Sequence, residues 1–224
     1  MPAPSSTPDA QAKRARRKES RPGELLAAAL DLFVEKGFAA TRVEEVAQRA
    51  GVSKGTLFLY FSSKEELFKA VVRQSLSGRF QEWSDEVDRC TGSSADLLRY
   101  GMTSWWERVG NTNASGITKL MLCEAHNFPE MAAFYQAEVA EPYHLLVRRI
   151  LQRGLDSGEF ADTDIDLATY SVTAPLIFLA MWKHSPSTHP CTTEAFDPEK
   201  YIAAQVHIIL NGLRARAPAD PRPP

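Results

Sequence analysis

Two short helices joined by a tight turn are predicted within residues 41–68, TRVEEVAQRAGVSKGTLFLYFSSKEELF. Val43 and Ala47 share the inner face of the first helix, and Gly51 supplies the left-handed turn that ends it. Ser53 then precedes the second helix as its N-cap. Two helices at this spacing form a helix-turn-helix, whose second helix enters the major groove of DNA. This window therefore predicts a DNA-binding unit.

Charge is divided unevenly between this region and the rest of the chain. Residues 1–64 contain 11 Lys and Arg against 7 Asp and Glu, whereas residues 65–224 contain 15 against 21. A basic cluster lies just before the window and consists of Lys13, Arg14, Arg16, Arg17, Lys18 and Arg21. Such a cluster suits DNA phosphates or a minor groove, and it suits a solvated, disordered tail equally well. Both interpretations stay open.

Composition is typical of a globular chain with a sizeable core. The 224 residues are 44% hydrophobic, and no stretch approaches the ~18 consecutive apolar residues of a membrane helix. The N-terminus lacks the apolar segment of a secretory signal, so we expect a cytoplasmic protein without a membrane partner. Cys90, Cys123 and Cys191 form no C-x-x-C pair and are expected to be reduced thiols.

Helical periodicity continues through nearly the whole chain, with no convincing strand and no internal repeat. Helices are predicted at about residues 25–36, 41–50, 54–61, 64–83, 93–110, 117–127, 129–157, 163–184 and 198–214. Pro142 lies inside the seventh helix and is expected to bend it. Residues 1–19 and 217–224 have little to bury and are predicted to be disordered.

The run AGVSKGTLFLYFSSKEELF, in its context, resembles the DNA-binding domain of TetR/AcrR-type transcriptional regulators. The match covers about Leu25–Leu76 and includes a helix that ends at Gly37, the Ala50–Ser53 turn and the Tyr60-Phe61 pair. The resemblance implies an all-α, nine-helix TetR-like architecture. It places a basic N-terminal arm at 1–19, the helix-turn-helix domain at 20–67, a helical ligand-binding and dimerisation domain at 68–216, and a disordered tail at 217–224.

A set of residues around the second helix is predicted to bind DNA. These are Thr41, Arg42, Ser53, Lys54, Gly55, Thr56, Leu59, Tyr60 and Lys64. Lys54 has the reach for a phosphate or a guanine edge, Gly55 allows close backbone approach, and the Thr56 methyl suits a thymine methyl. Leu59 on this face indicates apolar base contact. The sequence departs from the family at Phe58-Leu59, where many members carry tyrosines.

Three of these residues have a structural alternative. Thr41 is expected to cap the helix in a capping box with Glu44, and its position at a helix N-terminus also suits a phosphate. The resemblance assigns phosphate contacts to Tyr60 and Lys64. A half-buried packing role for Tyr60 and a solvated first-turn position for Lys64 remain the alternatives.

A two-fold dimer is expected, because one helix-turn-helix buries little DNA. Two recognition helices about 34–36 Å apart would read a near-palindromic operator. The resemblance assigns the interface to the last two helices, with Leu167, Tyr170, Ile177, Tyr201, Val206 and Ile209 as its predicted residues. The alternative is that these helices form the core of one subunit.

The middle helices are rich in Trp, Met and Phe and are predicted to line an apolar ligand pocket. The candidate ligand contacts are Met102, Trp105, Met121, Leu122, Glu124, His126, Phe134, Tyr143 and Phe178. Plain core packing is the alternative for each. A small apolar or aromatic effector would release a repressor from its operator. An effector-independent regulator and an activator also remain open.

An enzyme is the remote alternative. Glu141 and His144 form a single E-x-x-H, whereas helical di-iron proteins use two such pairs and further glutamates. Pro142 also lies between them. The sequence has no phosphate-binding glycine loop and no H-E-x-x-H. We therefore expect no catalytic residue, metal or cofactor.

Overall fold

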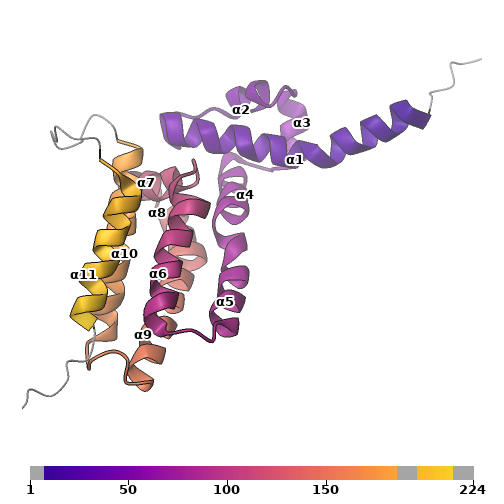
Figure 1. The fold of residues 1–224 in the computed structure, drawn as a ribbon. Coiled ribbons are helices and arrows are strands. Elements are labelled where there is room, and N and C mark those ends of the chain that lie inside the picture. The colour runs from indigo at the N-terminus through magenta and orange to yellow at the C-terminus, as the bar shows by residue number, and fades with distance from the viewer. Residues whose placement is uncertain (1–7, 186–195, 214–224) are drawn as a thin grey trace, which may run out of the picture. The chain divides into compact units, whose positions relative to one another are not determined.

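The computed structural model describes residues 8–185 and 196–213, with side chains from Ser20 onward, and within these ranges it contains no β-strand. The chain divides into two compact units, Met1–Gln74 and Ser75–Pro224 (Figure 1). Among the described helical segments, α4 with α5 and α8 with α9 correspond to two helices that the sequence predicted as single ones. The remaining helices match one to one, so the nine-helix prediction is confirmed.

The first unit packs its helices around a small aromatic core. Its helices are α1 (Pro8–Lys36), α2 (Val43–Arg49), α3 (Lys54–Phe58) and α4 (Lys64–Ser75). The ring centroids of Phe33, Phe38 and Phe68 lie 5.5 to 5.6 Å apart. Leu57 of α3 is completely buried. Gly37 and Gly51 both have positive φ, as the turns after α1 and α2 require.

Helix α1 begins earlier than the sequence analysis expected. Residues 8–19 are helical, although disorder was predicted for 1–19. The segment from residue 9 to 21 is rich in Ala, Lys and Arg, which are strong helix formers and extend a helix already anchored by its later turns. Residues 1–7 and 217–224 lie outside the described residues.

The second unit contains the remaining helices. They are η1 (Ser77–Arg79), α5 (Phe80–Arg89), α6 (Ser94–Trp105), η2 (Trp106–Gly110), α7 (Ser115–Glu124), α8 (Pro129–Tyr135), η3 (Gln136–Ala140), α9 (Glu141–Asp156), α10 (Ile165–Lys183) and α11 (Pro198–Leu213). Their starts carry the expected caps: Ser93 accepts from the Asp96 N–H, and Asp197 accepts from the Glu199 and Lys200 N–H groups.

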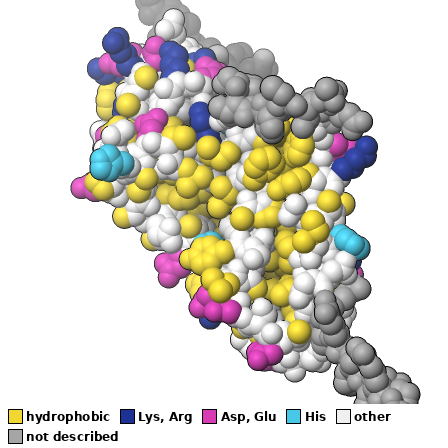
Figure 2. Space-filling model, turned by 90° about the vertical axis from the view of Figure 1, so that its left-hand side faces the viewer, with side chains coloured by type: hydrophobic (Ala, Val, Ile, Leu, Met, Phe, Trp, Pro, Cys, Tyr) yellow, Lys and Arg dark blue, Asp and Glu magenta, His cyan; other side chains and the backbone are white. Residues whose placement is uncertain are grey.

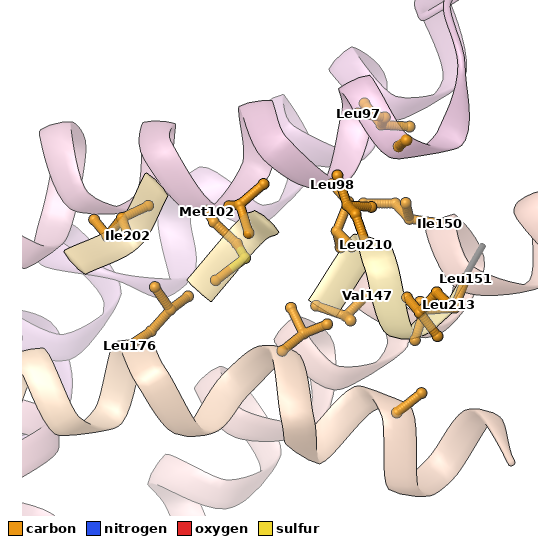
Figure 3. Packing of buried hydrophobic residues seen from close by; sticks show 14 of the residues in the cluster. Leu97, Leu98, Met102, Val147, Ile150, Leu151, Leu176, Ile202, Leu210 and Leu213 are labelled. Atoms are coloured by element: carbon orange, nitrogen blue, oxygen red, sulfur yellow. The ribbon is translucent and has the colours of Figure 1, made fainter. Parts of the chain in front are cut away.

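Helices α6, α9, α10 and α11 enclose the core of this unit. Figure 3 shows Leu98, Leu151, Leu176 and Leu210 among the side chains that converge there, and each is at most 3% exposed. The carboxylate of Glu159 accepts hydrogen bonds from the first N–H groups of α6, at 2.7 and 2.9 Å. This contact ties the loop after α9 to the start of α6 and satisfies donors that the helix itself leaves open.

A π-turn accommodates the proline that was expected to bend the seventh helix. The turn η3 ends immediately before α9, and the N–H of Glu141 bonds to the carbonyl of Gln136, five residues back. Pro142 follows within the first turn of α9, where its missing N–H is tolerated. Such turns bend helices and are frequent at functional sites.

Helix α10 is long and apolar enough, by length and composition, to cross a membrane. The sequence analysis expected no run of ~18 consecutive apolar residues. Ala168, Val172, Leu176 and Leu179 are buried in the core of the unit. Their burial explains why a helix packed inside a globular unit passes this test.

Candidate functional site

Helix α3 presents one exposed face beside a buried one. Ser53 caps it, accepting from the Thr56 N–H at 3.1 Å, and the Ser53 and Thr56 hydroxyl oxygens lie 2.9 Å apart. Leu57 points into the core, whereas Lys54 and Gly55 are exposed and Leu59 is 83% exposed. The helix ends at Phe58, earlier than the predicted Phe61, through a tight turn at Leu59.

Lys54 makes an ion pair across the helix-turn-helix. Its ammonium lies 2.7 Å from the Glu44 carboxylate and 5.7 Å from the centre of the Phe58 ring. The hydrogen bond from Lys54 lowers the pKa of Glu44 below its ordinary value. Both side chains are more than half exposed, and such surface pairs contribute at most about 1 kcal/mol. A DNA phosphate can therefore replace Glu44 as the partner of Lys54.

Thr41 lies in a different place from the one predicted. It is 1% exposed, and its hydroxyl donates to the carbonyl oxygens of Leu32 and Gly37 at 3.1 and 2.7 Å. Arg42, not Thr41, is the N-cap of α2, and Glu45 accepts from its backbone N–H. The predicted capping box with Glu44 is therefore wrong by one residue. The Thr41 side chain holds the end of α1 and is not on the surface.

Lys64 is also engaged within the first unit. Its ammonium donates to the carbonyl oxygens of Phe38, Ala39 and Thr41 at 2.8, 3.3 and 3.1 Å. It also lies 4.4 Å from the centre of the Phe38 ring. The three donors of an ammonium are thus all used on the loop between α1 and α2. This is neither the phosphate contact nor the solvated position considered for Lys64.

The other predicted DNA contacts lie at or near the surface. Arg42 is exposed at the start of α2. Thr56 is half-buried, and its hydroxyl is hydrogen-bonded to that of Ser53. Tyr60 is half-buried, with its ring 6.5 Å from that of Phe61. The exposed basic groups of this face are thus Arg42 and Lys54, both near the start of a helix. Most of the basic cluster before the window lies outside the described side chains.

A cavity of about 320 Å³ lies within the second unit. Its lining side chains come from α5, α6, α7, α8, η3, α9 and α10, with η2 and the residue before η1. They are Leu76, Phe80, Trp83, Trp105, Val109, Thr118, Met121, Leu122, Ala125, Ala132, Tyr135, Gln136, Val139, Ala140, Tyr143, His144, Thr173, Leu176 and Ile177. None of these described lining residues is a lysine, arginine, aspartate or glutamate. The cavity is therefore suited to an apolar ligand with few polar groups.

Four of the nine candidate ligand residues line this cavity: Trp105, Met121, Leu122 and Tyr143. Met102 borders a smaller adjoining cavity of about 50 Å³. The others lie elsewhere. His126 is exposed, Glu124 and Phe134 are half-buried, and Phe178 packs against Phe196 and Tyr201. Neither predicted polar handle, Glu124 or His126, borders the cavity.

Apart from Tyr143, the polar side chains of the cavity were missed by sequence reasoning. Thr118 and Tyr135 share a 2.9 Å hydrogen bond between their hydroxyls, and Thr173 donates to the carbonyl of Thr169. Burial raises the pKa of both Tyr135 and Tyr143. A signal was available for part of this wall, because prolines within helices accompany local backbone irregularity and Pro142 precedes Tyr143 directly.

The predicted dimer residues fall into two groups. Leu167, Tyr170 and Ile177 on α10 are 65%, 59% and 36% exposed. Tyr201 and Ile209 on α11 are half-buried against the core cluster. Figure 2 shows hydrophobic side chains spread over this side of the molecule. The exposed group leaves apolar side chains on the surface of α10.

Val206 belongs to the subunit core instead of the predicted interface. It is 4% exposed and lies in the cluster with Ile202 and Leu210. On α11 these three residues follow helical spacing toward α6 and α10. The same periodicity that suggested an interface describes one face of a core helix.

The single E-x-x-H does not gather a metal site in the described part of the chain. Glu141 is exposed, whereas the ring of His144 packs edge-on against Tyr170 at 5.4 Å. Among the described residues, no three His, Cys, Asp or Glu side chains meet in a geometry for a metal ion.

An exposed α3 face on a helix-turn-helix, followed by a helical unit with an uncharged cavity, defines a DNA-binding transcriptional regulator. The chain belongs to the tetR family of bacterial regulatory proteins. Residues 25–71 match that family, and residues 88–197 match the tetracyclin repressor-like C-terminal domain.

Known proteins resemble the chain over most of its length or over a shorter part of it. It is 30% identical over 196 residues to the HTH-type transcriptional repressor KstR2 of Mycobacterium tuberculosis, covering 87% of this chain and 93% of that protein. It is 50% identical over 64 residues to the regulator RutR of Escherichia coli, covering 29% and 30% of the two chains. A FadR structure from Bacillus subtilis with stearoyl-CoA shares the fold, with a TM-score of 0.70 and 19% identity over 84% of this chain and 97% of that one.

Proposed function

We propose that this protein is a dimeric repressor that binds a near-palindromic operator and releases it when a small apolar effector enters the cavity of the second unit. The observation that carries the effector assignment is the cavity itself. Its walls are mostly apolar, and no described lining residue carries a lysine, arginine or carboxylate charge. Repression is supported by the relative KstR2, which is a transcriptional repressor.

The DNA contacts that we propose are Arg42, Ser53, Lys54, Gly55, Thr56, Leu59 and Tyr60. Arg42 and Lys54 bind phosphates, while Thr56 and Leu59 face the bases. Most such contacts position a protein on DNA, and only the few base contacts select sequence. Lys64 and Thr41 act indirectly, by holding the loop that leads into α2.

Dimerisation uses the exposed apolar residues of α10, with Leu167, Tyr170 and Ile177 as its contacts. In addition, Phe178 is 39% exposed on the same helix and Ile208 is 61% exposed on α11. These exposed side chains support an interface because a monomer would leave them in water. A two-fold dimer would present two α3 helices to successive major grooves. The protein therefore acts where chromosomal DNA is found, in the cytoplasm.

Effector release works through a shift between two conformations. The effector stabilises the conformation that it binds more tightly, by no more than its difference in affinity for the two. Covalent continuity supplies a route, because α4 ends at Ser75 and the next residue, Leu76, lines the cavity. If the protein were an effector-independent regulator, this cavity would have no role. Whether the protein represses or activates depends on where the operator lies relative to the promoter.

Fluorescence anisotropy tests the proposal. DNA fragments tiled across the region upstream of the gene are titrated with protein in excess nonspecific competitor. We expect saturable binding to one fragment, tighter than to the others by ~10³ or more. Effector candidates are then added to the complex. Uniform weak binding, or an operator complex that no cavity ligand releases, would contradict the proposal.

A further inference from the structure

One wall of the larger cavity carries polar side chains that make no hydrogen bond to another side chain in the described residues. Gln136, Tyr143 and His144 lie on η3 and α9, next to the π-turn, and all three line the cavity. Gln136 begins the π-turn and Tyr143 lies in the first turn of α9 that follows it. The walls from α5, α6 and α7 are mostly apolar.

Tyr143 has the most distinctive environment of the three. It lines both the larger cavity and the smaller one, and burial alone raises the pKa of its hydroxyl. The hydroxyl makes no hydrogen bond with any residue in the described part of the chain. As a residue Tyr143 is half-buried, and tyrosine hydroxyls that are turned away from bulk water usually have a partner. An unpaired hydroxyl beside a cavity therefore marks a position for a ligand atom.

Tyr135 provides a contrast within the same cavity. Its hydroxyl is 2.9 Å from the Thr118 hydroxyl, so its hydrogen bonding is already satisfied within the protein. Trp83 differs again, because it lines both cavities and its indole Nε1–H is buried without a partner in the described residues. The unsatisfied groups on this side thus include two that donate hydrogen bonds.

The walls also bear on the charge and size of the ligand part that they enclose, because some lining residues, among them Leu122 and Gln136, are exposed. A buried ion needs a counter-charge, and the described lining of the larger cavity offers no lysine, arginine or carboxylate. An engineered apolar cavity of about 150 Å³ binds benzene, so a cavity roughly twice as large accommodates about a dozen non-hydrogen atoms. This corresponds to a bicyclic molecule.

We propose that the cavity selects a neutral, bicyclic-sized molecule with one carbonyl or hydroxyl oxygen, and that the Tyr143 hydroxyl donates the hydrogen bond to that oxygen. This inference rests on the proposed effector function and assigns its ligand class. Tyr143 is a specificity residue here, while Tyr135 with Thr118 shapes the wall.

Isothermal titration calorimetry at pH 7 with three matched probes tests the ligand class. The probes share a bicyclic skeleton. 1-Tetralone carries one carbonyl, tetralin carries no polar group, and 1,2,3,4-tetrahydro-2-naphthoate carries a carboxylate. We expect 1-tetralone to bind about three- to tenfold more tightly than tetralin, the value of one neutral hydrogen bond. The carboxylate probe should bind at least about 100-fold more weakly than 1-tetralone, because its charge stays unpaired.

Two conservative variants test the residue assignment. Tyr143→Phe removes a hydroxyl without an internal partner, so the fold is retained, and it should lower 1-tetralone affinity to that of tetralin. Tetralin binding should not change. The matched variant Tyr135→Phe should alter the preference for 1-tetralone over tetralin less than twofold.

The inference is overturned if no probe binds, if the carboxylate binds as well as the ketone, or if Tyr143→Phe keeps the ketone preference. Operator binding without any probe is measured on the same samples. If the unaltered protein shows no preference for 1-tetralone but still binds its operator, only the ligand class is contradicted. Normal probe binding without a specific operator contradicts the proposed repressor function.

Discussion

The side-chain ammonium of Lys64 donates a 2.8 Å hydrogen bond to the backbone carbonyl of Phe38, 26 positions earlier in the chain. Two further carbonyls of the same loop, those of Ala39 and Thr41, complete its coordination. The start of α4 thereby holds the segment that leads into α2. A residue that sequence similarity assigns to phosphate binding is, in this geometry, a support for the DNA-binding unit.

Lys64→Ala should therefore act on stability more than on salt dependence. We expect the free energy of unfolding to fall by about 1–3 kcal/mol, since a charged hydrogen-bond donor is lost from three carbonyls. Specific operator affinity should fall with it, while the slope of log affinity against log salt stays constant. Chemical denaturation and anisotropy at several salt concentrations measure both. Lys69→Ala, which removes a surface pair with Glu66, is the control. A slope smaller by about one unit would restore the phosphate role.

Glu44→Gln should strengthen binding to DNA of any sequence. The carboxylate of Glu44 holds the Lys54 ammonium at 2.7 Å and adds a negative charge near α3. Its removal should raise affinity up to about fivefold, the equivalent of a surface ion pair. Anisotropy with operator and with random DNA measures the change. Glu35→Gln, which breaks the exposed pair with Arg49, should change affinity less, and equal effects would argue against a special role for Lys54.

Leu59→Ala should lower operator affinity without lowering stability. The side chain is 83% exposed, so its truncation leaves no cavity in the unit. Loss of an apolar base contact should weaken specific binding by about 1–3 kcal/mol and leave nonspecific binding intact. Thr56→Val should instead change the order of preference among operator variants. Competition anisotropy with a set of operators that each differ by one base distinguishes these results. If both variants keep the base preferences of the original protein, α3 does not contact the bases through Leu59 or Thr56.

Leu167→Asp should separate the proposed dimer. Leu167 is 65% exposed on α10, and a buried charge there would lack a partner in a two-fold interface. We expect a monomer by sedimentation velocity and at least about a 100-fold loss of operator affinity, because two half-sites no longer bind together. Leu145→Asp changes another exposed leucine, on α9 and 54% exposed, and this variant should remain a dimer. A dimeric Leu167→Asp protein would place the interface elsewhere.

Acidification should destabilise the second unit through His184. Its pKa is lowered to about 4 by burial, by Lys183 and by Lys119, while its Nε2 lies 2.9 Å from the Ser115 hydroxyl. His184 therefore binds a proton less tightly in the folded state than in the unfolded chain, where it is protonated near pH 6.5. The stability contribution is complete above pH 6.5 and declines as pH falls toward 4. Calorimetric Tm between pH 7 and 4 should fall less steeply for His184→Gln, whereas the exposed His126→Gln should follow the original protein.

Local chemistry predicted the positions of most helix ends. Gly37, Gly51 and Gly158 have the positive φ that chain reversals after a helix need. Ser53 and Ser93 accept the hydrogen bonds expected of N-caps. These features depend on residues within three or four positions, so they can be recognised from the sequence alone. Beyond them, the helix-turn-helix pattern was enough to predict the fold class.

The sequence by itself thus determined the all-α fold, the helix-turn-helix and the exposed positions of Lys54 and Leu59. Tertiary structure alone decided that Lys64 bonds to a loop 23 to 26 positions away, that Val206 is core, and that Tyr143 and Gln136 border a cavity while Glu124 does not. The physical reason is that helical periodicity shows which residues share a face. It does not show which other helix, cavity or solvent that face meets, because this depends on packing between segments distant in the chain.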